Sequence, residues 1–393
     1  MNLNQDHNPG ILKPLPFLYL CSKGLPPMTK KKHKNSALKV QGGIDQPSQV
    51  NPSLSGGLHK FKKAALSVDD FYRGIISNDR TMLGRAITLI ESSRPDDKEI
   101  ARQLINRCLP HSGVSVRLGI TGVPGAGKST FIESFGLSLI DKGHKVAVLA
   151  IDPSSTRTKG SILGDKTRME ELSISPAAYI RPSASAGTLG GVARATREAV
   201  VLCEAAGFDI IIIETVGVGQ SETAVSQIVD FFLLLMIAGG GDELQGIKRG
   251  IMEMADLVVI NKADGDNVKK AELAKRQYEN ALHLFPALPN GWIPKVMTAS
   301  ALYSTGIDEV WQIVEEFVRH TKESSYFEKH RNEQSLAILK ESIEQGLASG
   351  FFCMPVIKPM IKKYEQEVLH AKINPYEAAQ LLLEKYLKEI KNS

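Results

Sequence analysis

The sequence predicts an α/β protein with a doubly wound, mostly parallel sheet, flanked by helical modules on both sides. In the middle of the chain, short runs that are apolar on both faces alternate with longer helical stretches, as expected of parallel strands covered by helices on both sides. A glycine-rich loop directly follows the first of these runs and directly precedes a helical stretch. The outer parts show helical apolar periodicity and no strand signal.

Length and composition support several modules in one chain. The 393 residues are 42% hydrophobic and 23% charged, which is ordinary globular usage. Residues 1–60 are rich in Pro, Gly, Ser, Asn and Lys and show no sustained apolar period, so we expect disorder there. The expected parts are a disordered basic tail over 1–60, a helical module over 61–115, an α/β domain over 116–320 and a helical arm over 321–393.

Charge and cysteine usage exclude several classes of protein. Eight Lys against two Asp give the tail a charge of +6, so the remaining chain is near −1 although the total is +5, and we expect no nucleic-acid partner. The four cysteines lie far apart, without the clustering of a zinc site or a disulfide framework. No apolar run approaches the roughly 18 residues needed to span a bilayer. We expect a cytoplasmic protein, or a mitochondrial matrix protein if the basic tail is a transit peptide.

The elements follow in a regular order. Apolar residues at helical spacing between 66 and 105 predict two or three amphipathic helices. Strands are predicted at 116–120, 146–151, 210–213, 231–237, 257–260 and 294–297. Helix returns after Gly306, and the apolar stripes from Lys322 to the end have no core left to cover. We therefore expect this arm to form an oligomer interface.

The loop after the first strand carries a nucleotide-binding motif. It matches G-x-x-x-x-G-K-[ST], and its flanking strand and helix are those the motif requires. Its backbone N–H groups would surround a phosphate at a helix N-terminus, Lys128 would contact the β and γ oxygens, and Ser129 would ligate Mg²⁺. This phosphate loop consists of Gly122, Val123, Pro124, Gly125, Ala126, Gly127, Lys128, Ser129 and Thr130.

Two later segments select the base. Asn261, Lys262, Ala263 and Asp264 end a predicted strand and resemble the NKxD motif of G proteins, in which the Asp accepts hydrogen bonds from guanine N1 and N2. Adenine lacks the 2-amino group and its N1 is an acceptor, so GTP is favoured over ATP. Ser300, Ala301 and Leu302 follow another strand and resemble the loop whose backbone amide reads guanine O6.

Three acids are expected at the carboxyl edge of the sheet, where ligands of parallel sheets bind. Asp152 and Glu214 each close a predicted strand, and Asp165 lies beside a Gly-rich stretch. Mg²⁺ accepts only one or two carboxylates beside phosphate oxygens and waters. Asp165 and Glu214 are therefore the candidates for direct or water-linked ligands, and Asp152 for the outer shell. A solvated strand-end carboxylate is the alternative for each acid alone.

The predicted switches suggest slow, regulated hydrolysis. Residues 214–217 resemble the DxxG motif of G proteins, in which the Gly amide senses the γ-phosphate. Val218 occupies the place of a water-orienting glutamine, and Gln220 comes two positions later, so a rearrangement or a partner must position the water. Residues 239–249, including Asp242 and Lys248, are interpreted as a third mobile switch; an ordinary surface loop is equally compatible.

Several strings together resemble the MeaB/ArgK/MMAA family of P-loop GTPases: ITGVPGAGKST, AIDPSS, SILGDKTRM, ETVGVGQSE and NKAD. The resemblance extends from about Leu66 to the C-terminal helices. It implies a SIMIBI-class G domain, a homodimer held by the C-terminal arm, and a chaperone for adenosylcobalamin-dependent methylmalonyl-CoA mutase. It also implies GTP/GDP and Mg²⁺ as ligands, and Lys128, Asp165, Glu214 and Lys248 as the catalytic group.

Other functions remain open from the sequence. The family also contains chaperones of isobutyryl-CoA mutase, so the resemblance leaves the client mutase open. A nickel metallochaperone of the hydrogenase or urease maturation type would need a Cys/His site, whereas the nine His are scattered. An ArgK-like kinase acting on a transport protein would use ATP, which residues 261–264 argue against.

Overall fold

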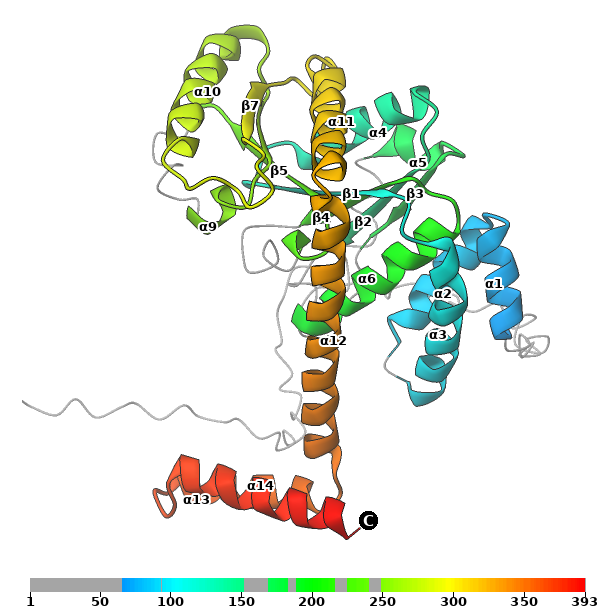
Figure 1. Ribbon diagram of the computed structural model, residues 1–393, viewed down its shortest axis with the longest axis vertical. Coiled ribbons are helices and arrows are strands. Elements are labelled where there is room, and N and C mark those ends of the chain that lie inside the picture. The colour runs from blue at the N-terminus through cyan, green and yellow to red at the C-terminus, as the bar shows by residue number, and fades with distance from the viewer. Residues whose placement is uncertain are drawn as a thin grey trace, which may run out of the picture. The chain divides into compact units, whose positions relative to one another are not determined.

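A parallel sheet forms the centre of the protein (Figure 1). The computed structural model describes residues 66–92, 94–151, 169–182, 189–215, 225–239 and 249–392. Within them the sheet has seven strands in the order β3-β2-β4-β1-β5-β6-β7, and each neighbouring pair is parallel. The strands are β1 Val116–Gly122, β2 Val146–Ile151, β3 Ala178–Arg181, β4 Ile210–Thr215, β5 Phe231–Ile237, β6 Leu257–Asn261 and β7 Lys295–Thr298.

The sequence prediction of the sheet is confirmed except at one strand. All six predicted strands form within one to two residues of their expected ends. β3 was not predicted: it has only four residues and pairs with β2 alone. No clear apolar pattern marks these residues, and the partner strand, not the sequence, defines β3.

Helices cover both faces of the sheet because alternate strand residues enter two separate cores. Ile211 and Ile213 of β4 join a cluster with α6, whereas Ile210 and Ile212 join a cluster with α4. This alternation is that of strands buried on both faces. The helices of this region are α4 Lys128–Asp141, α5 Glu170–Ile174, α6 Leu189–Ala205, α9 Arg249–Met252, α10 Val268–Leu282 and α11 Ile307–Glu323.

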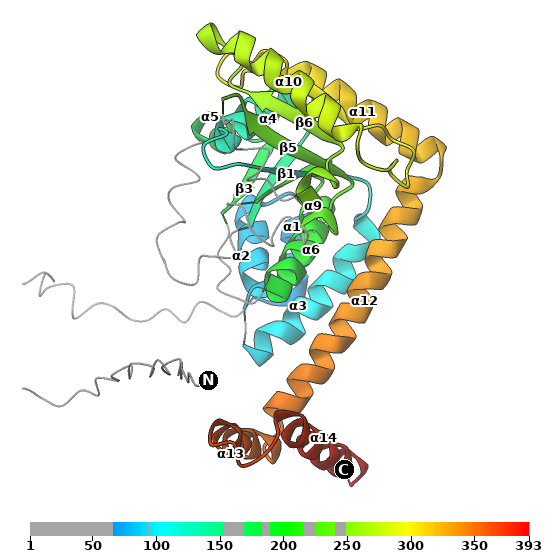
Figure 2. The same cartoon turned by 90° about the vertical axis from the view of Figure 1, so that its left-hand side faces the viewer.

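The expected N-terminal helical module is present and packs against α6 (Figure 2). It consists of α1 Val68–Ile76, α2 Arg80–Ile90 and α3 Pro95–Cys108. Ser67 and Asp70 form a capping box at the start of α1, and the Asp79 carboxylate accepts hydrogen bonds from two backbone N–H groups at the start of α2. The predicted tail, residues 1–60, lies outside the described residues.

The chain ends in helices, as the sequence predicts. These are α12 Tyr326–Cys353, α13 Ile357–Leu369 and α14 Pro375–Lys391. Leu336, Leu339, Ile343 and Leu347 of α12 are each more than half exposed, and their spacing places them along one side of the helix. Among the described residues no helix is long and apolar enough to cross a membrane.

Candidate functional site: the carboxyl edge of the central strands

The phosphate loop is shaped by its glycines. Gly125 and Gly127 have φ angles of 81° and 83°, a left-handed conformation that side chains disfavour. Gly122 lies against β5, where an added Cβ would come within 2.1 Å of the Leu235 carbonyl oxygen. The chain then enters α4 at Lys128. Backbone N–H groups and the positive end of the helix dipole therefore meet at this loop, which suits it to bind phosphate.

Lys128 lies in the first turn of α4 and folds back over the loop. Its Nζ donates to the carbonyl oxygen of Gly122 at 2.9 Å and to that of Val123 at 3.4 Å. The side chain is half-buried. The ammonium group is thus held at the loop itself, where a bound phosphate would meet its charge.

Asn261, at the end of β6, joins two loops. Its Nδ2 donates to the Ala126 carbonyl oxygen at 2.8 Å, and its Oδ1 accepts from the Ala301 N–H at 3.1 Å. The residue is 1% exposed, so both hydrogen bonds are shielded from water. Asn261 therefore holds the phosphate loop and the 300–302 loop at a fixed spacing.

Asp264 receives a hydrogen bond from the 300–302 loop. The Ser300 hydroxyl donates to Asp264 Oδ2 at 2.5 Å. Ser300 is itself held by a pair of backbone hydrogen bonds with Thr305, and Leu302 is 71% exposed. The sequence-predicted residues Asp264, Ser300 and Ala301 are therefore brought together. Reading of guanine by this group stays a prediction, as does reading of O6 by the loop backbone.

Glu214 lies on the strand beside the phosphate loop. It is 5% exposed near the end of β4 and is paired in register with Ile120 of β1, two residues before the loop begins. The next residue, Thr215, donates from its hydroxyl to the hydroxyl of Thr121 at 2.7 Å, and both are buried. This hydroxyl pair, which ties the end of β4 to the end of β1 directly before the phosphate loop, is a site feature that the sequence analysis missed.

Several other predicted metal and switch residues belong to segments that the structure does not describe. Asp152 follows β2 directly, but Asp152, Asp165 and Lys248 lie outside the described residues, as do Val218, Gln220 and Asp242. Within the described ranges no group of three or more His, Cys, Asp or Glu side chains could hold a metal ion. The magnesium assignment therefore stays a prediction, with Ser129 and Glu214 as its members inside the described part.

Comparisons with known proteins show which family this chain is similar to. The model of a family described as Methylmalonyl Co-A mutase-associated GTPase MeaB matches residues 83–354. A probable GTPase of Mycobacterium tuberculosis is 50% identical over 318 residues, which cover 81% of this chain and 95% of the relative. The GTPase ArgK of Escherichia coli is 48% identical over 302 residues, covering 77% and 90% of the two chains.

A eukaryotic relative and a solved structure extend the likeness. The mitochondrial methylmalonic aciduria type A homolog of Mus musculus is 47% identical over 329 residues, covering 81% of this chain and 79% of the relative. A crystal structure named LAO/AO transport system kinase superposes with a TM-score of 0.65 at 38% identity, covering 81% of this chain and 97% of that chain.

Proposed function

We propose, since this chain belongs to the MeaB family of methylmalonyl-CoA mutase-associated P-loop GTPases, that it is a chaperone of a cobalamin-dependent acyl-CoA mutase. In this proposal, GTP hydrolysis gates the loading of adenosylcobalamin and protects the mutase, and methylmalonyl-CoA mutase is the client. The observation that best supports the guanine-nucleotide part is the Asn261 side chain, which joins the phosphate loop to the loop that supports Asp264.

The site residues suit GTP and magnesium. The phosphate loop offers backbone N–H groups, and Lys128 supplies a positive charge beside them. Ser129 and Glu214 offer a hydroxyl and a carboxylate, which are oxygen ligands of the kind that Mg²⁺ prefers. Magnesium bound there would neutralise charge on the phosphate oxygens. The chain's own contribution is to orient the nucleotide and to exclude adenine.

The proposed turnover is slow without a partner. Val218 stands where a glutamine would orient the attacking water, so the chain lacks that group at the usual position. The mutase is expected to accelerate hydrolysis by ordering the predicted third switch. Such gating requires that the client contacts the GTP-bound and GDP-bound states differently. If a nucleotide changes the affinity for the client by some factor, the client must change the affinity for that nucleotide by the same factor.

Two alternatives use other chemistry. The solved relative is named a transport system kinase, so an ArgK-like kinase activity is a second candidate function. It predicts phosphoryl transfer from ATP to a protein, whereas Asp264 and its Ser300 partner favour guanine. A metallochaperone role is the third, and it has no support among the described His and Cys side chains.

We propose a homodimer formed through the exposed stripe of α12, residues Leu336, Leu339, Ile343 and Leu347. An exposed apolar row of this kind is a typical interaction surface. Replacing Leu339 and Ile343 by Lys should give monomers, as light scattering would show. Removing the whole arm from Lys322 is a poorer test, because α12 also carries a buried contact to the sheet. An unchanged dimer in the double-Lys variant would move the interface elsewhere.

In this proposal the protein lies in the same cellular compartment as the mutase that it serves. Relatives include a bacterial GTPase and a protein named mitochondrial. We propose a cytoplasmic location, with the mitochondrial matrix as the alternative if the basic tail directs import.

The decisive experiment is nucleotide turnover with candidate clients. GTP and ATP hydrolysis are measured for the protein alone, with methylmalonyl-CoA mutase and with isobutyryl-CoA mutase. We expect slow GTP turnover that one mutase stimulates, and no ATP turnover. If neither mutase changes turnover or nucleotide affinity, the gating proposal is wrong. ATP use with transfer to a protein would favour the kinase.

A further inference from the structure

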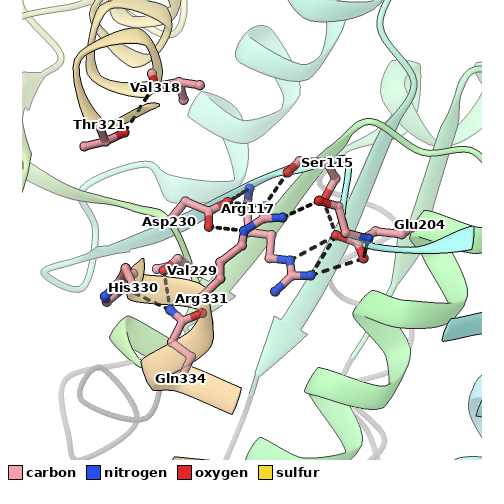
Figure 3. Close-up of polar contacts among 11 residues, drawn as sticks. Ser115, Arg117, Glu204, Val229, Asp230, Val318, Thr321, His330, Arg331 and Gln334 are labelled. Carbon is pink, nitrogen blue, oxygen red and sulfur yellow. Dashed lines mark hydrogen bonds and ion pairs between the residues drawn. The ribbon is translucent and has the colours of Figure 1, made fainter. Parts of the chain in front are cut away.

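A largely buried arginine of α12 binds the amino edge of the sheet, opposite the candidate site (Figure 3). Arg331 forms a two-point ion pair with Asp230, with Nε–Oδ1 at 2.8 Å and Nη2–Oδ2 at 2.7 Å. The same guanidinium donates to the carbonyl oxygens of Gly113 at 2.5 Å and Ser115 at 2.6 Å. Its side chain is only 14% exposed, and that of Asp230 only 2%. One side chain therefore holds the residues just before β1 and just before β5.

The contact continues into the sheet and to α6. Asp230 Oδ2 also accepts from the Arg117 backbone N–H at 2.8 Å. The Arg117 guanidinium pairs with Glu204 of α6, with Nε–Oε1 at 3.0 Å and Nη2–Oε2 at 3.2 Å. The Glu204 side chain is fully buried and also accepts from the Ser115 hydroxyl at 2.5 Å. These four charged residues form one continuous network, linked through the Arg117 backbone N–H and through Ser115 (Figure 3).

The two strands that this network holds meet at the phosphate loop at their other ends. β1 runs into the loop, and β5 lies beside it, with Leu235 in register with Gly122. Gln334, one turn beyond Arg331, donates to the Val229 carbonyl oxygen at 2.8 Å, just before β5. At about 3.3 Å per residue, β1 carries the contact roughly 20 Å to the phosphate loop.

We propose that Arg331 is a positioning residue for the nucleotide site: it sets β1 and β5 relative to each other and thereby couples α12 to the phosphate loop. This rests on the GTP-binding part of the proposed function and is independent of its client. A shift of α12 acts on both strands at once, because one rigid guanidinium contacts the residues that precede both. The network thus links the arm to the candidate nucleotide site.

The geometry requires an arginine. The planar guanidinium serves a carboxylate and two carbonyl oxygens together, which the single ammonium group of lysine cannot reproduce. A second ion pair, between Arg197 of α6 and Glu341 of α12 at 2.7 Å, also fastens α12 but contacts neither β1 nor β5. Arg197 is 12% exposed, close to the value for Arg331. It is therefore a matched control for simple tethering.

The test compares Arg331→Lys, Arg331→Met and Arg197→Met in the full-length protein without any mutase. Dissociation constants for GTP and GDP are measured by calorimetry, at a temperature where circular dichroism shows each variant folded. We expect both Arg331 variants to weaken GTP about tenfold more than GDP, a typical size of coupling between sites. Arg197→Met should lower the melting temperature and leave the GTP-to-GDP affinity ratio unchanged. An unchanged ratio in the Arg331 variants, or an equal change in all three, overturns the proposal.

A measurement on the wild-type protein covers the case in which the Arg331 variants do not fold. Hydrogen exchange is followed in peptides covering residues 113–117 and 229–232, with GDP and with a non-hydrolysable GTP analogue. Coupling predicts slower exchange at this edge in the GTP state. Identical exchange in both states overturns the proposal. Since no mutase is present, either result is separate from the fate of the chaperone hypothesis.

Discussion

Replacing Asp256 by Asn should make the protein more stable above neutral pH and remove a pH dependence of its stability. Asp256 precedes β6 and is 7% exposed. Burial raises the pKa of this carboxyl from 3.8 to about 7, against the smaller opposing effect of the Phe232 N–H, which donates to it at 2.8 Å. A pocket of about 260 Å³ beside it is also lined by Glu253, Tyr326 and His330.

The direction in which stability changes with pH follows from proton binding. Between pH 3.8 and about 7 the folded protein holds the Asp256 proton and the unfolded chain does not, so the free energy of unfolding falls as the pH rises through this window. A pKa difference of about three units corresponds to at most ~4 kcal/mol. Asn keeps an oxygen acceptor for the Phe232 N–H and carries no charge. The fall in the free energy of unfolding with rising pH should therefore disappear in this variant.

The assay is reversible urea unfolding at pH 5 and pH 8. We expect the free energy of unfolding of Asp256→Asn to exceed that of the wild type by about 1–4 kcal/mol at pH 8 and by much less at pH 5. Asp141→Asn, at an exposed position on α4, controls for the loss of one negative charge. If the Asp256 variant keeps the wild-type pH slope, or is less stable at pH 8, the buried carboxyl does not titrate as argued.

Three further predictions concern the nucleotide site. Gly122→Ala should abolish GTP binding or folding, because the new Cβ would lie 2.1 Å from the Leu235 carbonyl oxygen. Circular dichroism reports whether the variant folds, and calorimetry reports whether it binds GTP. A normal GTP affinity would contradict this prediction. Asp264→Asn should weaken GTP and favour xanthosine triphosphate, because an amide donor replaces a carboxylate acceptor; equal thermal protection of the wild type by ATP and GTP would refute the assigned base selectivity. Lys128→Ala should remove tight triphosphate binding, whereas Glu214→Ala should spare much of it and lose Mg²⁺-dependent hydrolysis; full turnover in both would show the assignment to be wrong.

Local patterns predicted most of the fold and the loops of the site. The strands around β1 are continuous apolar runs, and the glycine-rich loop requires a strand before it and a helix after it, so each is readable within about ten residues. The contact of Asn261 with Ala126 joins segments 135 positions apart, yet the two motifs that contain them were recognisable separately.

Contacts between distant segments could not be predicted in this way. Thr121 and Thr215 are 94 positions apart, and Arg331 and Asp230 are 101 apart. No local pattern marks either pair. The first depends on β1 and β4 becoming neighbours in the sheet, and the second on how the helix α12 packs against the amino edge of the sheet. β3 was missed for the related reason that only β2 gives its four residues a strand's hydrogen bonds.

The two outermost strands of the described sheet, β3 and β7, have four residues each. In the part of the chain that the structure describes, the sheet therefore offers only short rows of open backbone hydrogen-bonding groups at its rims. Short rims are a poor template for adding a strand from another molecule, so they protect a strongly apolar sheet against edge-to-edge aggregation. Association through a continuous intermolecular sheet is thus disfavoured, and specific recognition falls to side chains on the helices, where single substitutions can adjust it without disturbing the strands.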